Sequence, residues 1–112
     1  MADCIFCQVA AGTIPVTVVK RTDRLLAFRD IHPQAPTHFL VIPTHHVASL
    51  NDVNDPGLLG EMLVFARDLA REAGIAQRGY RVVANTNPDG GQTVFHLHLH
   101  VLGGRPFRWP PG

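Results

Sequence analysis

The chain has 112 residues, of which 46% are hydrophobic and 17% charged, and its formal net charge is +1. This length predicts a single domain over residues 1–112, with enough buried surface to fold without disulfides. The balanced charge leaves no basic surface for nucleic acid and no polybasic patch for a membrane. The stretch Met1–Cys4 lacks the pattern of a signal peptide, and no apolar run reaches the ~18 residues of a membrane span. We therefore expect a cytoplasmic protein.

The N-terminal part of the chain predicts a short helix that carries both cysteines. The helix covers Cys4–Gly12, with Asp3 as its N-cap and Gly12 at its end. Cys4 and Cys7 stand in C-x-x-C spacing, which suits zinc binding or redox exchange and also occurs by chance. In the cytoplasm two cysteines are thiols or metal ligands rather than a structural disulfide.

Three strands are expected to follow this helix. Thr17–Lys20 and Leu25–Asp30 are rich in strand-forming residues and are joined by a polar turn. Residues 30–38 form a loop, because two prolines interrupt regular structure there. Phe39–Pro43 is an apolar run that fits a buried strand.

The long helix of the chain is predicted over Pro56–Ala73. Asp55 supplies its N-cap, proline occupies its first turn, and Gly74 ends it. Its apolar stripe is wider than one packing face needs. The simplest interpretation is a helix lying across a sheet, and the extra width leaves room for a subunit interface.

The last third of the chain predicts a hairpin and an extended tail. Tyr80–Asn85 is a fourth strand, and Asn87–Gly91 turns the chain back through a loop of about seven residues into a fifth strand. Arg105–Gly112 is too rich in proline to be helical. The predicted fold is α+β, an antiparallel sheet of about five strands with one long helix and a short N-terminal helix.

The fifth strand, Thr93–Leu102, alternates histidines with aliphatic residues. On a strand this pattern sends Leu97, Leu99 and Val101 into the core and aligns three histidines on the opposite face, about 6–7 Å apart. These histidines are His96, His98 and His100. Aligned imidazoles can bind zinc, or one can attack an electrophile while its neighbours supply protons. The remaining alternative is a polar strand face that happens to be rich in histidine.

Residues 96–102, His-Leu-His-Leu-His-Val-Leu, resemble the signature of the histidine triad (HIT) family of nucleotide hydrolases and transferases. Other stretches, in the same order, resemble the Hint branch of this family, the purine nucleoside phosphoramidases. These are Cys4–Cys7, Asp30–Pro43, Gly90–Phe95, Leu102–Arg105 and Trp109–Gly112. The resemblance covers almost the full chain and implies a HIT-like fold.

The resemblance also implies a mechanism. His98 is the nucleophile that attacks the phosphorus of an adenosine or guanosine 5′-monophosphoramidate and forms a covalent nucleotidyl-histidine. The backbone carbonyl of His96 orients its ring, and His100 stabilises a phosphate oxygen or protonates the leaving group. His38 matches a histidine that relays protons, although it could equally be a core residue.

A nucleotide-binding set follows from the same resemblance. Asp30 matches a residue that binds the ribose hydroxyls, with a turn residue at a strand end as the alternative. Apolar residues form a slot for the purine, although periodicity alone would place them in the core. Amides of Gly90–Thr93 approach the phosphate, unless the two glycines only form a turn. The full set is Asp30, Ile31, Ile5, Phe6, Phe28, Asn85, Gly91, Gln92, Thr93 and Val94, with Val9 as a further slot residue.

A structural zinc is implied by members of the family that hold one with two cysteines and two histidines. The matching residues are Cys4, Cys7, His46 and His96, and a Cys2His2 set is closed to substrate. His45 is one residue off the matching position. The alternative is an empty site with free thiols. No organic cofactor is expected.

The expected partners are a purine nucleotide, AMP or GMP or their phosphoramidates, and a second copy of the chain. The resemblance implies a homodimer, formed by the long helix and the Tyr80–Asn85 strand. Neither nucleic acid nor membrane is an expected partner. Other functions compete: a dinucleoside polyphosphate hydrolase, a nucleotide-binding regulator with incidental activity, or a metalloenzyme with three histidine ligands. Arg29 and His32 depart from the family pattern.

Overall fold

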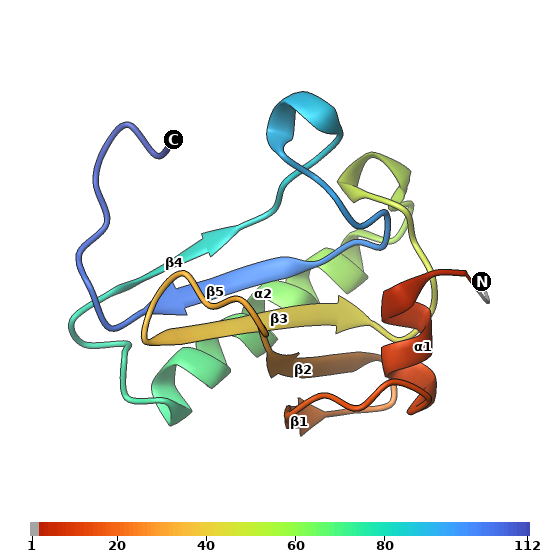
Figure 1. The fold of residues 1–112 in the computed structure, drawn as a ribbon, viewed down its shortest axis with the longest axis horizontal. Helices are drawn as coiled ribbons and strands as arrows, with labels where there is room; N and C mark the ends of the chain where they lie inside the picture. The colour runs from red at the N-terminus through yellow and green to blue at the C-terminus, as the bar shows by residue number, and fades with distance from the viewer. Residues whose placement is uncertain (1–2) are drawn as a thin grey trace.

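The computed structural model describes residues 3–112. Met1 and Ala2, part of the stretch on which the absence of a signal peptide rests, lie outside the described residues. Five antiparallel strands form a sheet of order β1-β2-β3-β5-β4, with a long helix and a short one against it (Figure 1). The elements are α1 (Ile5–Ala11), β1 (Val18–Arg21), β2 (Leu25–Arg29), β3 (Thr37–Pro43), α2 (Pro56–Glu72), β4 (Tyr80–Val83) and β5 (Leu99–Gly103). The predicted fold class is confirmed.

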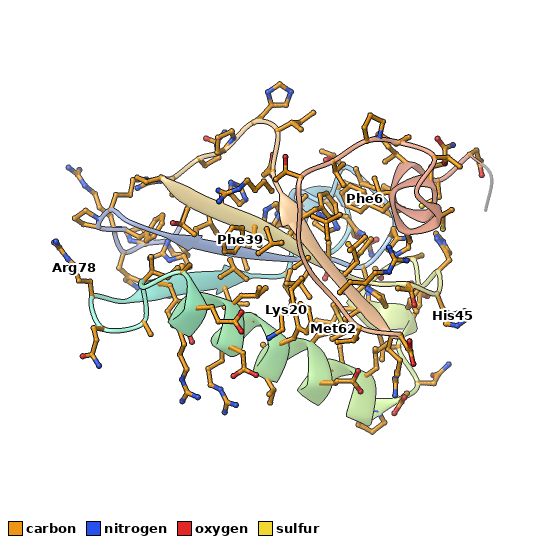
Figure 2. All side chains as sticks on the ribbon, turned by 90° about the horizontal axis from the view of Figure 1, so that it is seen from below. Phe6, Lys20, Phe39, His45, Met62 and Arg78 are labelled. Atoms are coloured by element: carbon orange, nitrogen blue, oxygen red, sulfur yellow. The ribbon has the colours of Figure 1, made fainter. Side chains whose placement is uncertain are left out.

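The sheet is buried on both faces, because its central strands carry apolar residues in both orientations. One face packs on α2 through residues such as Phe39, Val101 and the fully buried Met62. The other face packs on α1 through Phe6, Phe28 and neighbouring aliphatic residues. Figure 2 shows Met62 and Phe6 on opposite sides of the sheet. The site described below lies on the α1 side.

The long helix α2 begins and ends close to the predicted positions. The Asp55 carboxylate accepts a hydrogen bond of 2.9 Å from the backbone N–H of Gly57, as an N-cap residue should. The helix ends at Glu72, and Gly74 follows with φ of +77°, in the left-handed region that favours glycine. None of the helices in residues 3–112 is both long and apolar enough to cross a membrane.

The N-cap of α1 is Cys4, so the prediction of Asp3 was wrong. Cys4 has extended backbone angles, and its sulfur accepts the N–H of Cys7 at 3.4 Å. A cysteine can therefore fill the position that the sequence preference for aspartate assigned to its neighbour. The helix ends at Gly12 as predicted, with φ of +80°.

The histidine strand is much shorter than predicted, and the Thr93–Leu102 boundary was wrong. β5 covers only Leu99–Gly103, and β4 ends at Val83, so the connection runs over residues 84–98. The cause lies in a distant segment. The N–H of Leu97 donates to the carbonyl of Val47 at 2.7 Å, outside the sheet ladder. The alternation nevertheless persists, since Leu97 packs in the α2-side core.

Candidate active site and metal centre

A cleft of about 330 Å³ opens on the α1 side of the sheet, next to the histidine segment. Ligand pockets of this kind begin at about 300 Å³. The structure brings together nine of the predicted site residues along its walls: Ile5, Phe6, Phe28, Asp30, Ile31, Thr93, Val94, His98 and His100. Val9, which was also expected in the purine slot, lines the same cleft. Apolar walls thus converge with a carboxylate and two imidazoles.

Sequence reasoning missed the segment between α1 and β1. Ile14, Pro15 and Val16 line the cleft, and so does Leu40 from β3. A usable signal was present, since the apolar residues on either side of Pro15 continue the alternation of the first strand. Arg29 and His32, which depart from the family pattern, also lie along the cleft.

His98 is held as a neutral imidazole with a defined tautomer. Its Nδ1 lies 2.7 Å from the backbone carbonyl of His96, so Nδ1–H donates and the lone pair is on Nε2. Burial lowers the pKa of His98, against the opposing effects of this hydrogen bond and of Asp30. The Phe6 ring meets the imidazole edge-on, with the centroids 5.1 Å apart. A neutral ring with its lone pair in a cleft is a competent nucleophile.

His100 belongs to a second, connected hydrogen-bond chain. The backbone N–H of Gln34 donates to Nδ1 of His38 at 3.0 Å, so the proton of neutral His38 is on Nε2. That Nε2–H faces Nδ1 of His100 at 2.9 Å and a carboxylate oxygen of Asp30 at 3.4 Å. His100 therefore carries its own proton on Nε2. Burial, with His98 and His38 nearby, lowers the pKa of His100 to about 4.

The glycine-rich loop uses its amides in hydrogen bonds of its own. The N–H groups of Gly90, Gly91 and Gln92 all donate to carbonyls within residues 87–88. The buried Gln92 side chain accepts from Asn87 N–H and donates to two more carbonyls, so it braces the loop. Gly91, Gln92 and Asn85 are not among the residues that line the cleft. Thr93 and Val94 of this segment line the cleft, and the binding of phosphate by Gly91 and Gln92 stays a prediction.

A separate cluster joins the two cysteines to two histidines beside α1. The ligand atoms of Cys4, Cys7, His46 and His96 all lie within 4.8 Å of one another. Three sulfur–nitrogen distances are 3.3, 3.4 and 3.5 Å. A tetrahedral zinc with ordinary bond lengths places sulfur and nitrogen ligands about 3.5 Å apart. Nδ1 of His96 can therefore face a metal while its Nε2 donates to the carbonyl of Pro43 at 2.8 Å.

The three triad histidines do not share one metal site. His96 turns its ring toward the cysteines and is not among the residues that line the cleft. Among the described residues a second group could hold a metal, namely Asp30, His38 and His100. There the Gln34 N–H on His38 Nδ1 keeps the other nitrogen protonated, which opposes metal binding. The structure gives no support to a metalloenzyme with His96, His98 and His100 as ligands.

Comparison with known proteins places this geometry in a family. The HIT domain family matches residues 11–107. A purine nucleoside phosphoramidase of Escherichia coli is 47% identical over 104 residues, which are 91% of this chain and 87% of that one. A HIT family hydrolase from Legionella pneumophila superposes with a TM-score of 0.95 at 54% identity, covering 98% of this chain and 100% of the other. These relatives confirm the prediction of a hydrolase.

A zinc-bound histidine triad family protein from Mycobacterium smegmatis is also similar, with a TM-score of 0.85 and 32% identity. The superposition covers 93% of this chain and 76% of the Mycobacterium smegmatis protein. Sequence identity, coverage and superposition agree on one assignment. This chain belongs to the HIT domain family.

Proposed function

We propose that the protein hydrolyses the P–N bond of purine nucleoside 5′-monophosphoramidates, with His98 as the nucleophile. The observation that carries this proposal is the hydrogen bond from His98 Nδ1–H to the His96 carbonyl. It leaves the Nε2 lone pair in a cleft that also contains Asp30 and His100. The similarity to a protein named purine nucleoside phosphoramidase supports the choice of substrate.

The proposed reaction has two steps. Nε2 of His98 bonds to phosphorus while the P–N bond breaks. The electron pair of the P–N bond goes to the amine, which takes a proton from solvent, and His100 Nε2–H donates a hydrogen bond to a phosphate oxygen. Water then attacks phosphorus and releases a proton to solvent, which balances the proton that the amine took up. The bond from phosphorus to His98 breaks, which restores the neutral imidazole and releases the nucleoside monophosphate.

Asp30 and the apolar walls would hold the nucleoside. One Asp30 oxygen accepts the N–H of His32 at 2.8 Å, and the other lies 3.4 Å from His38. A carboxylate offers about four lone-pair sites, so both oxygens retain capacity for ribose hydroxyls. The purine would lie between Phe6, Phe28 and the aliphatic residues of the cleft.

We also propose a structural zinc on Cys4, Cys7, His46 and His96. The donor set and its spacing fit a closed tetrahedral site, and bound zinc would link α1 to the sheet. Burial and the neighbouring Cys4 raise the pKa of the Cys7 thiol, so metal binding must displace a proton from it. The zinc would hold His96 and, through its carbonyl, the orientation of His98.

A cytoplasmic homodimer completes the proposal. β4 is an edge strand of the sheet, free on one side to pair with its copy. On α2, the side chains of Leu63 and Val64 are 55% and 46% exposed, which would be costly in an isolated monomer. Light scattering should give twice the chain mass of 12.3 kDa.

The decisive experiment is single-turnover mass spectrometry with an adenosine phosphoramidate, quenched early. The wild type should carry an AMP adduct on the peptide that contains His98, and His98→Ala should carry none. His45→Ala is the matched control, because His45 is exposed and lies outside the cleft. Intact substrate and no adduct on wild type would refute the proposal. A parallel panel of dinucleoside polyphosphates would reveal the competing hydrolase activity.

A further inference from the structure

The loop between β2 and β3 is tied to the C-terminal segment at one residue. Gln34 uses both of its backbone groups, since its N–H donates to His38 Nδ1 at 3.0 Å and its carbonyl accepts from Arg105 Nε at 2.9 Å. A continuous chain of hydrogen bonds therefore leads from Arg105 through Gln34 and His38 to His100. None of the predicted roles involves Arg105.

The Gln34 N–H determines which ring nitrogen carries the proton in His38 and, through it, in His100. A backbone N–H can only donate, so His38 Nδ1 must accept and its proton must be on Nε2. Both groups that face this Nε2, namely His100 Nδ1 and the Asp30 carboxylate, are acceptors. His100 is then left with its proton on Nε2, the nitrogen that would donate a hydrogen bond to a phosphate oxygen. Exchanging the tautomer of His38 would break its hydrogen bond from the Gln34 N–H and reverse the hydrogen bond between His38 and His100.

Arg105 is well placed to keep the Gln34 N–H in position. Gln34 lies between strands, and its exposed side chain donates to the carbonyl of His32 within the same loop. Arg105 is itself held, because its Nη1 donates to the carbonyl of Pro106 at 3.0 Å and its guanidinium lies 4.3 Å from the centre of the Phe107 ring. A guanidinium held on three sides fixes the carbonyl it binds.

We propose that Arg105 is a positioning residue, which holds the Gln34 carbonyl so that the Gln34 N–H keeps His38 in its Nε2–H tautomer and His100 with its proton on Nε2. The effect on protonation is a property of the fold. Its consequence for catalysis rests on the proposed phosphoramidase function. Arg105 touches no residue of the triad directly, so it acts only through Gln34 and His38.

The test reads the tautomers directly, by long-range ¹H–¹⁵N NMR of the histidine side chains in the full chain. We expect His38 of the wild type to be protonated on Nε2, and Arg105→Ala to show both tautomers for His38 and His100. Arg105→Lys keeps one donor for the carbonyl and should largely restore the single tautomer. The control is Arg78→Ala, because Arg78 lies at the same end of the molecule, exposed and without a bond to Gln34.

Kinetics with an adenosine phosphoramidate supply the second measurement. Arg105→Ala should lower kcat by about tenfold with KM changed less than about twofold, since a hydrogen-bond donor to the reacting group contributes about 10²–10³-fold and only part of it is lost. An unchanged tautomer in Arg105→Ala, or an equal change in Arg78→Ala, would overturn the assignment. If Arg105→Ala does not fold, Gln34→Pro removes the N–H itself, and a single His38 tautomer in that variant would overturn it as well. An inactive wild type with ordered tautomers would refute only the proposed function.

Discussion

Acid should destabilise this fold through His100 as the pH falls below about 6.5. The ring is partly buried and its pKa is lowered to about 4 by burial and by the neighbouring His98 and His38. An unfolded histidine titrates near 6.5. Between these values the unfolded chain binds a proton that the folded chain does not. The stability contributed by neutral His100 is therefore complete above pH 6.5 and is lost as the pH falls toward 4.

The size of this loss follows from the two pKa values. Between pH 7 and pH 4.5 the linkage relation gives at most about 2.5 kcal/mol for His100, an upper bound because solvent partly screens the ring. His38 has a lowered pKa for the same main reason, burial, and acts in the same direction. The exposed Asp55 has its pKa lowered below 3.8 by Arg24, so it contributes only at lower pH.

Urea unfolding of wild type and His100→Asn at pH 7, 6, 5 and 4.5 measures this effect. Asparagine can accept the His38 Nε2–H through Oδ1 and does not titrate. The fall in the free energy of unfolding from pH 7 to pH 4.5 should therefore be smaller in the variant than in wild type, by up to about 2.5 kcal/mol. Both proteins contain the cysteine–histidine cluster, so its contribution to the pH dependence cancels when the free energy of unfolding of the variant is subtracted from that of wild type. His32→Asn is the control, since His32 is exposed and should change the pH dependence little.

Parallel pH dependence in wild type and His100→Asn would refute this reasoning. It would mean that the folded protein takes up the His100 proton as readily as the unfolded chain does. A steeper loss in the variant than in wild type would contradict the sign of the linkage as well as its size.

Three further predictions concern the core and the metal. Met62→Ala should lower the free energy of unfolding, measured with urea, by about 2–5 kcal/mol, because the side chain is fully buried between α2 and the sheet. The control Arg67→Ala should change it by less than about 0.5 kcal/mol, because Arg67 is exposed. Gly103→Ala should cost about 1–3 kcal/mol, since its Cβ would lie 2.6 Å from Cδ1 of Ile75, and Ile75→Ala should recover part of that cost in the double variant. Elemental analysis should find one zinc per chain, and a chelator should lower Tm in wild type but not in Cys7→Ser.

The helix α2 and the number of strands were predictable because their signals are local. An aspartate cap, a proline in the first turn and a glycine after the last turn mark α2, and the structure places its ends at Pro56 and Glu72. Most of the cleft was predictable from the family resemblance, since Asp30, Phe6 and His98 do lie along one cavity.

The parts that failed depend on bonds between distant segments. Leu97 gives its N–H to Val47, and Gln92 gives its amide to Ala48, so the chain before β5 follows a loop some 45 residues away instead of pairing with β4. An alternating pattern predicts which way side chains face, and that part was correct. It does not predict which backbone partner a segment finds, and for that reason the strand began at Leu99 and not at Thr93.

His96 shows how one residue can serve two sites without its side chain entering the cleft. Its ring uses Nε2 for the Pro43 carbonyl and turns Nδ1 toward Cys4 and Cys7, while its backbone carbonyl fixes His98. A metal on the ring would therefore restrict the carbonyl that selects the tautomer of His98. The three histidines of the triad thus differ in their hydrogen bonds. The carbonyl of His96 accepts from His98, His98 has its lone pair on Nε2, and His100 has its proton on Nε2. Alternation along the sequence sets their common side, and their separate hydrogen-bond partners set their separate roles.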